Sequence, residues 1–273
     1  MSPADFAFAL RITEHEGWGV TEKDLQRILS IEPHGTLIAV EHETPLGLAS
    51  GFTFGQLGWI GNVIVANRRR GLGVGKALVN QVISYLRARG ATHVALYTYE
   101  ENIAFYERLG FEKVAEFRRY YGFTRPTMGQ NRSRVLKETD LKRLAALDRE
   151  AFGGDRMRLL ELVYGDNPTM CFLNESGDDV SGFVIAKDYS TSVEIGPLVS
   201  SGSAAAEDLL NSVLKGSGGR PVELGIFMMN EPSVRMTEAA GLSVQRRGAM
   251  MTLGESWRPN LDLVFALGFL DKG

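Results

Sequence analysis

The segment Val63–Val79, VIVANRRRGLGVGKALV, constrains the fold more than any other part of this chain. An apolar run typical of a β-strand leads into three arginines, glycines follow at every second position from Gly71 to Gly75, and a helical pattern then begins. Glycine costs conformational entropy wherever it lies, so three in close succession need a reason. The order strand, glycine loop, helix favours an anion site, because backbone N–H groups at the start of a helix can face a phosphate.

Two familiar nucleotide motifs do not fit this spacing. A Walker A loop needs four residues between its glycines and a hydroxyl residue after the lysine, whereas only three residues separate Gly71 from Gly75 and Ala77 follows Lys76. A dinucleotide fingerprint needs its third glycine one residue later and an acidic residue after a second strand. The remaining interpretation is a short loop that holds a pyrophosphate with its amides and with the positive end of the helix dipole.

The loop residues would then have separate tasks. Gly73 and Gly75 lack a Cβ atom, so phosphate oxygens could approach the backbone, while Arg70 and Lys76 add positive charge. The alternative is a solvated basic cluster or a targeting patch. Three arginines are few for a targeting patch, and that interpretation leaves the glycines unexplained.

The rest of the first half supplies the expected neighbours of such a loop. Apolar residues at helical spacing predict a helix over 76–89 that ends at Gly90. We predict a short helix over 24–29, strands within 36–54, at 59–65, 92–98 and 111–122, and a second short helix over 102–109 that ends at Gly110.

The second half repeats this order. We predict helices over 139–152, 204–214 and 232–240, and strands at 171–175, 181–189, 192–200, 221–229 and 244–253. A repeat of about 130 residues indicates a duplicated domain. We therefore predict an α/β (α+β) chain with one domain over 1–125, a linker over 126–133 and a second domain over 134–273.

The hexapeptide Arg70-Gly71-Leu72-Gly73-Val74-Gly75 fits the pattern R-x-x-G-x-G and resembles the acyl-CoA-binding loop of the GNAT superfamily of N-acetyltransferases. The resemblance extends to the strand before the loop, the helix and strand after it, and the short helix with Asn102, Tyr106 and the pair Gly110-Phe111. It covers residues 36–122 best. The second half resembles the diverged C-terminal domain of a tandem GNAT subgroup.

This resemblance implies two GNAT-like domains, each a twisted mixed, mostly antiparallel sheet flanked by helices. It also implies direct transfer of an acetyl group from acetyl-CoA, as cosubstrate, to a small primary amine, without a metal. The residues that the resemblance assigns to acetyl-CoA are Val63, Ile64, Val65, Arg70, Gly71, Leu72, Gly73, Val74, Gly75, Lys76 and Asn102.

The resemblance assigns the catalytic acid to Tyr106, which would protonate the departing thiolate. The alternatives are a packed aromatic for Tyr106 and a helix N-cap for Asn102. The base is open, because the strand over 59–65 has no glutamate. Glu16 and Trp18 lie in a segment expected to flank the acceptor, although Glu14, His15 and Glu16 are also typical surface residues.

The second half lacks the loop. Its matching segment EIGPLVSSGSAAAEDLL has no R-x-x-G-x-G, and its short helix has Asn230 but offers Met236 in place of a tyrosine. We therefore predict that the second half does not bind CoA. It would shape the acceptor pocket or stabilise the first domain by packing.

Composition limits the remaining classes of function. A net charge of −3 does not indicate a broad basic footprint for nucleic acid, and the single Cys171 excludes an internal disulfide or a cysteine zinc site. The N-terminus is not typical of a signal peptide, and no apolar run is long enough to span a membrane. We expect a cytoplasmic monomer or homodimer. A non-catalytic acyl-CoA sensor and an acetyltransferase for protein N-termini or lysines remain alternatives.

Overall fold

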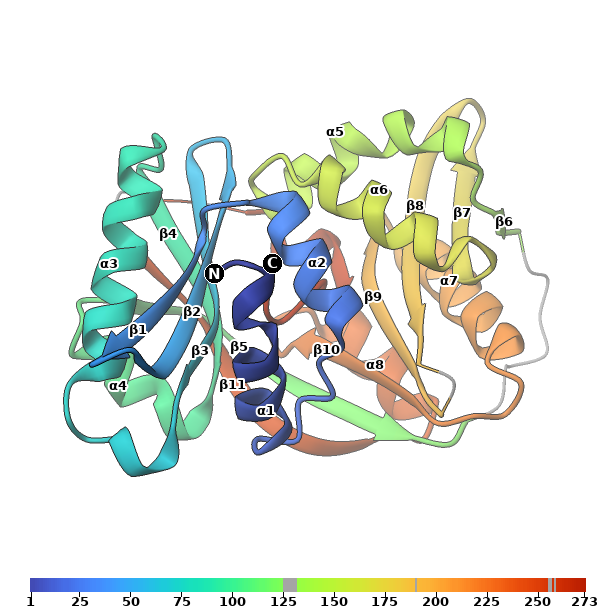
Figure 1. Cartoon of the computed structure of the whole chain (residues 1–273). Helices are drawn as coiled ribbons and strands as arrows, with labels where there is room; N and C mark the ends of the chain where they lie inside the picture. Colours follow the sequence, from blue (N-terminus) through green and yellow to red (C-terminus); the bar gives the residue numbers. More distant parts are fainter. Residues whose placement is uncertain (125–131, 190, 255–256, 258) are drawn as a thin grey trace.

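The computed structural model describes residues 1–124, 132–189, 191–254, 257 and 259–273. These residues form one long twisted sheet with helices on both faces (Figure 1). The first half contains α1 (Phe6–Glu14), α2 (Glu22–Ile31), β1 (Thr36–Glu41), β2 (Thr44–Phe54), β3 (Leu57–Val65), α3 (Val74–Ala88), β4 (His93–Tyr99), α4 (Ile103–Glu107) and β5 (Glu112–Gly122).

The second half repeats the same order of elements. It contains β6 (Arg134–Val135), α5 (Leu141–Phe152), α6 (Met157–Asp166), β7 (Cys171–Ser176), β8 (Asp179–Asp188), β9 (Val193–Ser200), α7 (Ser203–Gly216), β10 (Val222–Phe227), α8 (Glu231–Ala239), β11 (Ser243–Gly254) and β12 (Val264–Ala266). The predicted linker over 126–133 lies mostly outside the described residues.

The apolar core explains which helices cover which face. Phe6, Leu25, Leu144 and Leu160 come from α1, α2, α5 and α6, and they share one buried cluster. Helices α3 and α4 pack on the opposite face of the first half, and α7 and α8 pack on that same face of the second half. We refer to these two faces as the α1 face and the α3 face.

The two halves share a continuous sheet because they exchange their last strands. The order is β1-β2-β3-β4-β11-β5-β10-β9-β8-β7-β6, so β11 of the second half lies between β4 and β5 of the first. Tyr99 pairs with Gly248 of β11, and Phe117 of β5 pairs with Phe227 of β10. The predicted α/β fold class is confirmed, but the sequence does not indicate this exchange. An alternating apolar pattern shows which face of a strand is buried and not which strand lies beside it.

Each half contains a gap between two parallel strands. Strands β3 and β4 pair only over Leu57–Trp59 and His93–Ala95, and β9 and β10 pair only over Val193–Glu194 and Val222–Glu223. Beyond these residues, no ladder joins the described parts of β3 and β4, or those of β9 and β10. In the first half, the end of β3 leads directly into the glycine loop and α3.

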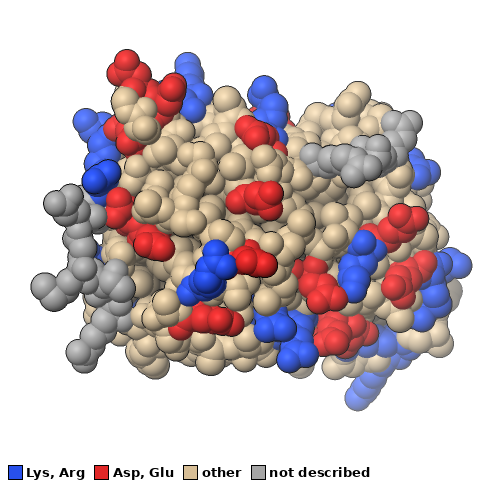
Figure 2. All heavy atoms as spheres, turned by 180° about the vertical axis from the view of Figure 1, so that it is seen from behind, with Lys and Arg blue, Asp and Glu red and all other residues tan. Residues whose placement is uncertain are grey.

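Charged side chains are spread over the surface. On the face seen from behind in Figure 2, Lys and Arg side chains alternate with Asp and Glu side chains instead of gathering into one basic surface. In the described part of the chain, no helix has both the length and the apolarity needed to cross a membrane.

Candidate functional site

The glycine loop has the conformation that its sequence requires. Gly71 and Gly73 have φ angles of +78° and +84°, the left-handed region that favours glycine. A Cβ atom added at either position would meet nothing within 4 Å, so the space around both residues is open. Gly75 has no such φ, and its added Cβ would only touch Phe105 and Val65 at 3.6 Å. There is therefore open space beside Gly71 and Gly73, directly before the N-terminus of α3.

Arg70, assigned from sequence to the phosphate loop, already has two partners. Its Nε donates to the carbonyl oxygen of Val65 at 3.0 Å, and its Nη2 donates to Glu16 at 2.5 Å. Arg69 pairs with Glu41 at 2.8 Å. Lys76 and Leu72 are exposed. The structure thus pairs Arg70, predicted to bind the pyrophosphate, with Glu16, predicted to flank the acceptor.

Glu16 belongs to the connection between α1 and α2, which also contains Trp18. The Trp18 side chain is 41% exposed, and its backbone N–H donates to the carbonyl of Thr13 at 3.1 Å. The structure therefore places Glu16 beside the end of β3 through Arg70, while Trp18 remains a half-exposed aromatic of the same connection.

The backbone of Val63 and Val65 faces the gap between β3 and β4. Ile64 is buried and pairs with Leu48, and the N–H of Ala66 donates to Leu46 at 2.8 Å on the β2 side. Because backbone groups alternate between the two edges of a strand, those of Val63 and Val65 point the other way. The N–H groups of Val63 and Val65 and the carbonyl of Val63 therefore face the gap, whereas the Val65 carbonyl accepts from Arg70.

A bulge at Asn62 interrupts β3 at the start of this edge. The β2–β3 register shifts between Leu48 and Ser50, and Asn62 has a φ of +53°. Asparagine is among the residues that tolerate this conformation. Sequence reasoning missed the bulge, although an asparagine inside an apolar strand was the available signal.

Asn102 and Tyr106 flank the same end of the gap. Asn102 directly precedes α4, is exposed, and makes no side-chain cap hydrogen bond, so the capping alternative is not supported. Tyr106 lies on the α3 face, 7% exposed, with edge contacts to Phe105 and Phe111. Burial raises the pKa of Tyr106 above its ordinary value.

The equivalent gap of the second half is filled by the chain itself. Val264 and Ala266 of β12 pair with Val199 and Leu198 of β9, and the N–H of Leu267 donates to the carbonyl of Gly225 in β10 at 2.7 Å. In the first half, no described strand pairs with β3 on the side that faces β4 beyond Trp59.

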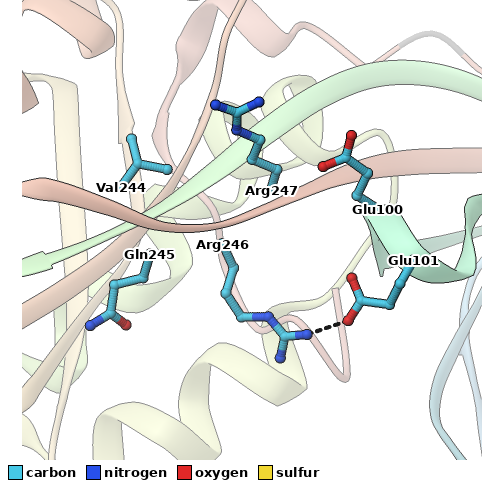
Figure 3. Close-up of a pocket in the computed structure, with 6 residues that line it drawn as sticks. All are labelled: Glu100, Glu101, Val244, Gln245, Arg246 and Arg247. Carbon is cyan, nitrogen blue, oxygen red and sulfur yellow. Dashed lines mark hydrogen bonds and ion pairs between the residues drawn. The ribbon is translucent and has the colours of Figure 1, made fainter.

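A hollow of about 410 Å³ lies at the carboxyl end of β4 (Figure 3). Glu100, Glu101, Val244, Gln245, Arg246 and Arg247 line it. The Arg246 guanidinium lies 3.6 Å over the ring of Tyr99 and pairs with Glu101. These two contacts hold the Arg246 side chain in place.

A row of ion pairs formed by Arg119, Glu223, Glu194 and Lys187 lies next to Arg246 at the centre of the sheet. Arg119 lies opposite Arg246 in the ladder and pairs with Glu223 at 2.5 Å and with Glu194 at 3.5 Å. Lys187 pairs with Glu194 at 2.5 Å. Burial alone would raise the pKa of Glu194, but Lys187 and Arg119 hold it below its ordinary value. Sequence reasoning missed this row because its members come from four strands.

Cysteine chemistry and metal binding are not indicated by the described part of the chain. Cys171 is buried, and burial raises the pKa of its thiol to about 12, as expected for a small core residue. Among the residues that the structure describes, no three His, Cys, Asp or Glu side chains lie together as a metal ion would require.

Two family models match the chain. The acetyltransferase (GNAT) family matches residues 6–111, and an acetyltransferase (GNAT) domain matches residues 144–266. The uncharacterized N-acetyltransferase YitH of Bacillus subtilis (strain 168) is 27% identical over 180 residues, which are 64% of this chain and 62% of that protein. The alignment therefore spans less than two thirds of this curated relative.

Solved structures show the same fold. A protein of Pyrococcus horikoshii assigned to the acetyltransferases has a TM-score of 0.87 and 21% identity, covering 100% of this chain and 94% of its own. A tandem GNAT protein from the clavulanic acid biosynthesis pathway has a TM-score of 0.60 and 15% identity, covering 87% of this chain and 89% of its own. With one GNAT model matched in each half and a tandem GNAT fold throughout, this chain belongs to the GNAT acetyltransferase family.

Proposed function

We propose that this chain is an acetyl-CoA-dependent N-acetyltransferase that transfers the acetyl group directly to a small primary amine. The observation that carries the proposal is the gap between β3 and β4. It opens beyond the pair Trp59–Ala95 and ends at the glycine loop and at Asn102. GNAT acetyltransferases use acetyl-CoA or another acyl-CoA, and we assign its binding to the place where β3 and β4 stop pairing beside the loop.

The residues along this path fit acetyl-CoA. Open space at Gly71 and Gly73 leaves room for phosphate oxygens at the N-terminus of α3. Lys76 makes no ion pair with any described residue, so its charge is available to an anion. The exposed Asn102 amide can donate to the pantetheine arm. When bound, acetyl-CoA supplies an activated acetyl group as a thioester.

The backbone edge of β3 would position that group. The N–H groups of Val63 and Val65 and the carbonyl of Val63 match the donors and acceptors of an extended amide chain, whereas the Val65 carbonyl already accepts from Arg70 at 3.0 Å. An N–H from this edge can also stabilise the thioester oxygen as it gains negative charge. Ile64 serves by packing in the core, since its backbone faces β2.

Tyr106 is assigned as the general acid. Its raised pKa keeps the hydroxyl protonated at neutral pH, as proton donation to a leaving thiolate requires. An alkylamine with a pKa of about 10.4 must first lose a proton, which costs roughly 4 to 5 kcal/mol at pH 7. Glu16 is held by Arg70, so we assign it, with Trp18, to the wall of the acceptor side.

The test is an assay of free thiol release from acetyl-CoA with a panel of amines, polyamines, amino acids and peptides. Release with small amines supports the proposal. Release only with peptides would indicate that the acceptor is a protein N-terminus or a lysine. Tight CoA binding without release for any acceptor would leave an acyl-CoA-binding module.

A further inference from the structure

The two halves treat equivalent gaps in opposite ways. In the second half, residues 261–267 lie between β9 and β10, at the position that corresponds to the unpaired part of β3 and β4 in the first half. Residues 261–272 are called the tail segment below. Within it, the strand is limited to β12, Val264–Ala266.

Asn230, the counterpart of Asn102, holds the tail segment. Each asparagine directly precedes the short helix of its half. Asn230 is 2% exposed, and its Nδ2 donates to the carbonyls of Asp262 and Val264 at 3.0 Å. Its Oδ1 caps α8 by accepting from the N–H of Ser233 at 3.1 Å. The amide that is exposed in the first half is therefore committed to the chain in the second.

Close backbone contacts leave no room for a second occupant. Ser233 donates to the carbonyl of Phe265 at 2.5 Å. A Cβ atom added at Gly196 would lie 1.8 Å from the carbonyl oxygen of Leu267, and one at Gly225 would lie 2.8 Å from the Leu267 side chain. Both strands that border the gap are thus packed directly against the tail segment.

The same segment then reaches the first half, as Figure 1 shows near α1 and α2. A Cβ atom added at Gly61 would lie 1.7 Å from the carbonyl oxygen of Asp271. Gly61 is two residues beyond Trp59, the last residue of β3 that pairs with β4, and directly precedes the bulge residue Asn62. The contact is therefore at the mouth of the gap, on the α1 face.

Side chains fix the tail segment at this crossing. Phe269 is buried, and the Lys187 ammonium lies 4.6 Å from the centre of its ring. Lys272 is buried and pairs with Asp271. The tail segment is therefore anchored by Asn230 in one half and packed on β3 beside the bulge in the other.

We propose that the tail segment permanently occupies the gap of the second half and acts as a positioning element for the acetyl site of the first. The effect of the tail segment on turnover rests on the proposed function. Its position in the gap of the second half rests on the fold alone. It predicts that each chain binds one CoA.

The substitution Asn230→Asp separates anchoring from capping, because aspartate keeps the oxygen that caps α8 but replaces the amide donor with a carboxylate facing two carbonyls. Hydrogen exchange should show faster exchange at Leu267 and at residues 268–272, with unchanged protection in α3. Titration with CoA should give one site per wild-type chain. Two sites in the wild type would overturn the occupancy.

Turnover tests the positioning. We expect kcat to fall about tenfold in Asn230→Asp, since small displacements of reacting groups are costly, while the Kd for CoA changes less than about twofold. The matched Asn102→Asp should instead weaken CoA binding. Gly61→Ala, which pushes directly on Asp271, should reproduce the fall in kcat, and Gly202→Ala, with open space around it, should not.

The outcomes separate the two proposals. Faster exchange of the tail segment with unchanged kcat in both Asn230→Asp and Gly61→Ala would overturn positioning while leaving the acetyltransferase intact. Absence of turnover in the wild type would overturn the proposed function, and the positioning role with it. The CoA stoichiometry and the exchange pattern would still decide whether the second gap is occupied.

Discussion

Arg70 and Glu16 form an ion pair, with 2.5 Å between Nη2 and Oε1, that ties the glycine loop to the connection between α1 and α2. A phosphate group at the loop would compete with Glu16 for this guanidinium. We predict that Glu16→Gln tightens CoA binding by about two- to fivefold, the range expected from a partly exposed ion pair. Calorimetric titration should show the gain shrinking at high salt. Weaker binding would contradict the competition, and Glu22→Gln on α2 is the control.

Gly73 and Gly90 lie at opposite ends of α3, with φ angles of +84° and +94° and nothing within 4 Å of an added Cβ. Alanine at either position should therefore cost a similar free energy of unfolding, about 1 to 2 kcal/mol. Only Gly73→Ala should raise the Kd for CoA, and Gly73→Asp should abolish binding through charge repulsion. Equal CoA affinities for the two alanine variants would show that the loop does not approach the ligand.

Arg134 joins Asp140 and Glu175 at one edge of the sheet, at 2.6 Å and 2.8 Å. Its hydrogen bond lowers the pKa of Asp140, and together with Arg143 it lowers the pKa of Glu175 to about 2. Carboxylates with lowered pKa values stabilise the fold above their unfolded pKa, and this stability is lost as pH falls through the folded pKa.

Arg134→Met should therefore lower the midpoint of thermal unfolding at pH 7, with the difference from wild type shrinking between about pH 4.5 and pH 2. Circular dichroism at a series of pH values measures this. Arg235→Met removes an exposed pair with Glu231 and should leave the midpoint nearly unchanged. A deficit for Arg134→Met that stays constant down to pH 2 would argue against the linkage.

Local patterns were enough to predict the elements around the site. The glycine loop, α3 and the short helix after Asn102 follow from residues close together in sequence, because capping, glycine conformation and helical spacing act over a few residues. Helices α1 and α6 were not predicted. The roles of Tyr106 and the loop residues in acetyl transfer remain predictions.

Long-range pairing could not be predicted from the sequence. The exchange of β5 and β11 depends on contacts between residues more than 100 positions apart, such as Phe117 with Gly248. The three residues of β12 are too few to show an alternating pattern. For the same reason Asn230 offered no sign that it holds the tail segment, although its match to Asn102 was visible.

Tyr106 supports the most direct test of the chemistry. Tyr106→Phe should lower kcat by about a hundredfold, the lower end for loss of a general acid, and leave the Kd for CoA nearly unchanged. Since burial raises its pKa above the ordinary value of 10.0, the hydroxyl stays protonated through pH 10. In the wild type, kcat/KM should therefore rise with pH as the amine loses its proton, without a descending limb from this tyrosine below pH 10.

Tyr85→Phe, which removes a hydroxyl bonded to Glu32 at 2.6 Å, is the control. Equal losses of turnover and CoA affinity in Tyr106→Phe would refute the acid role, because a residue needed only for packing affects both.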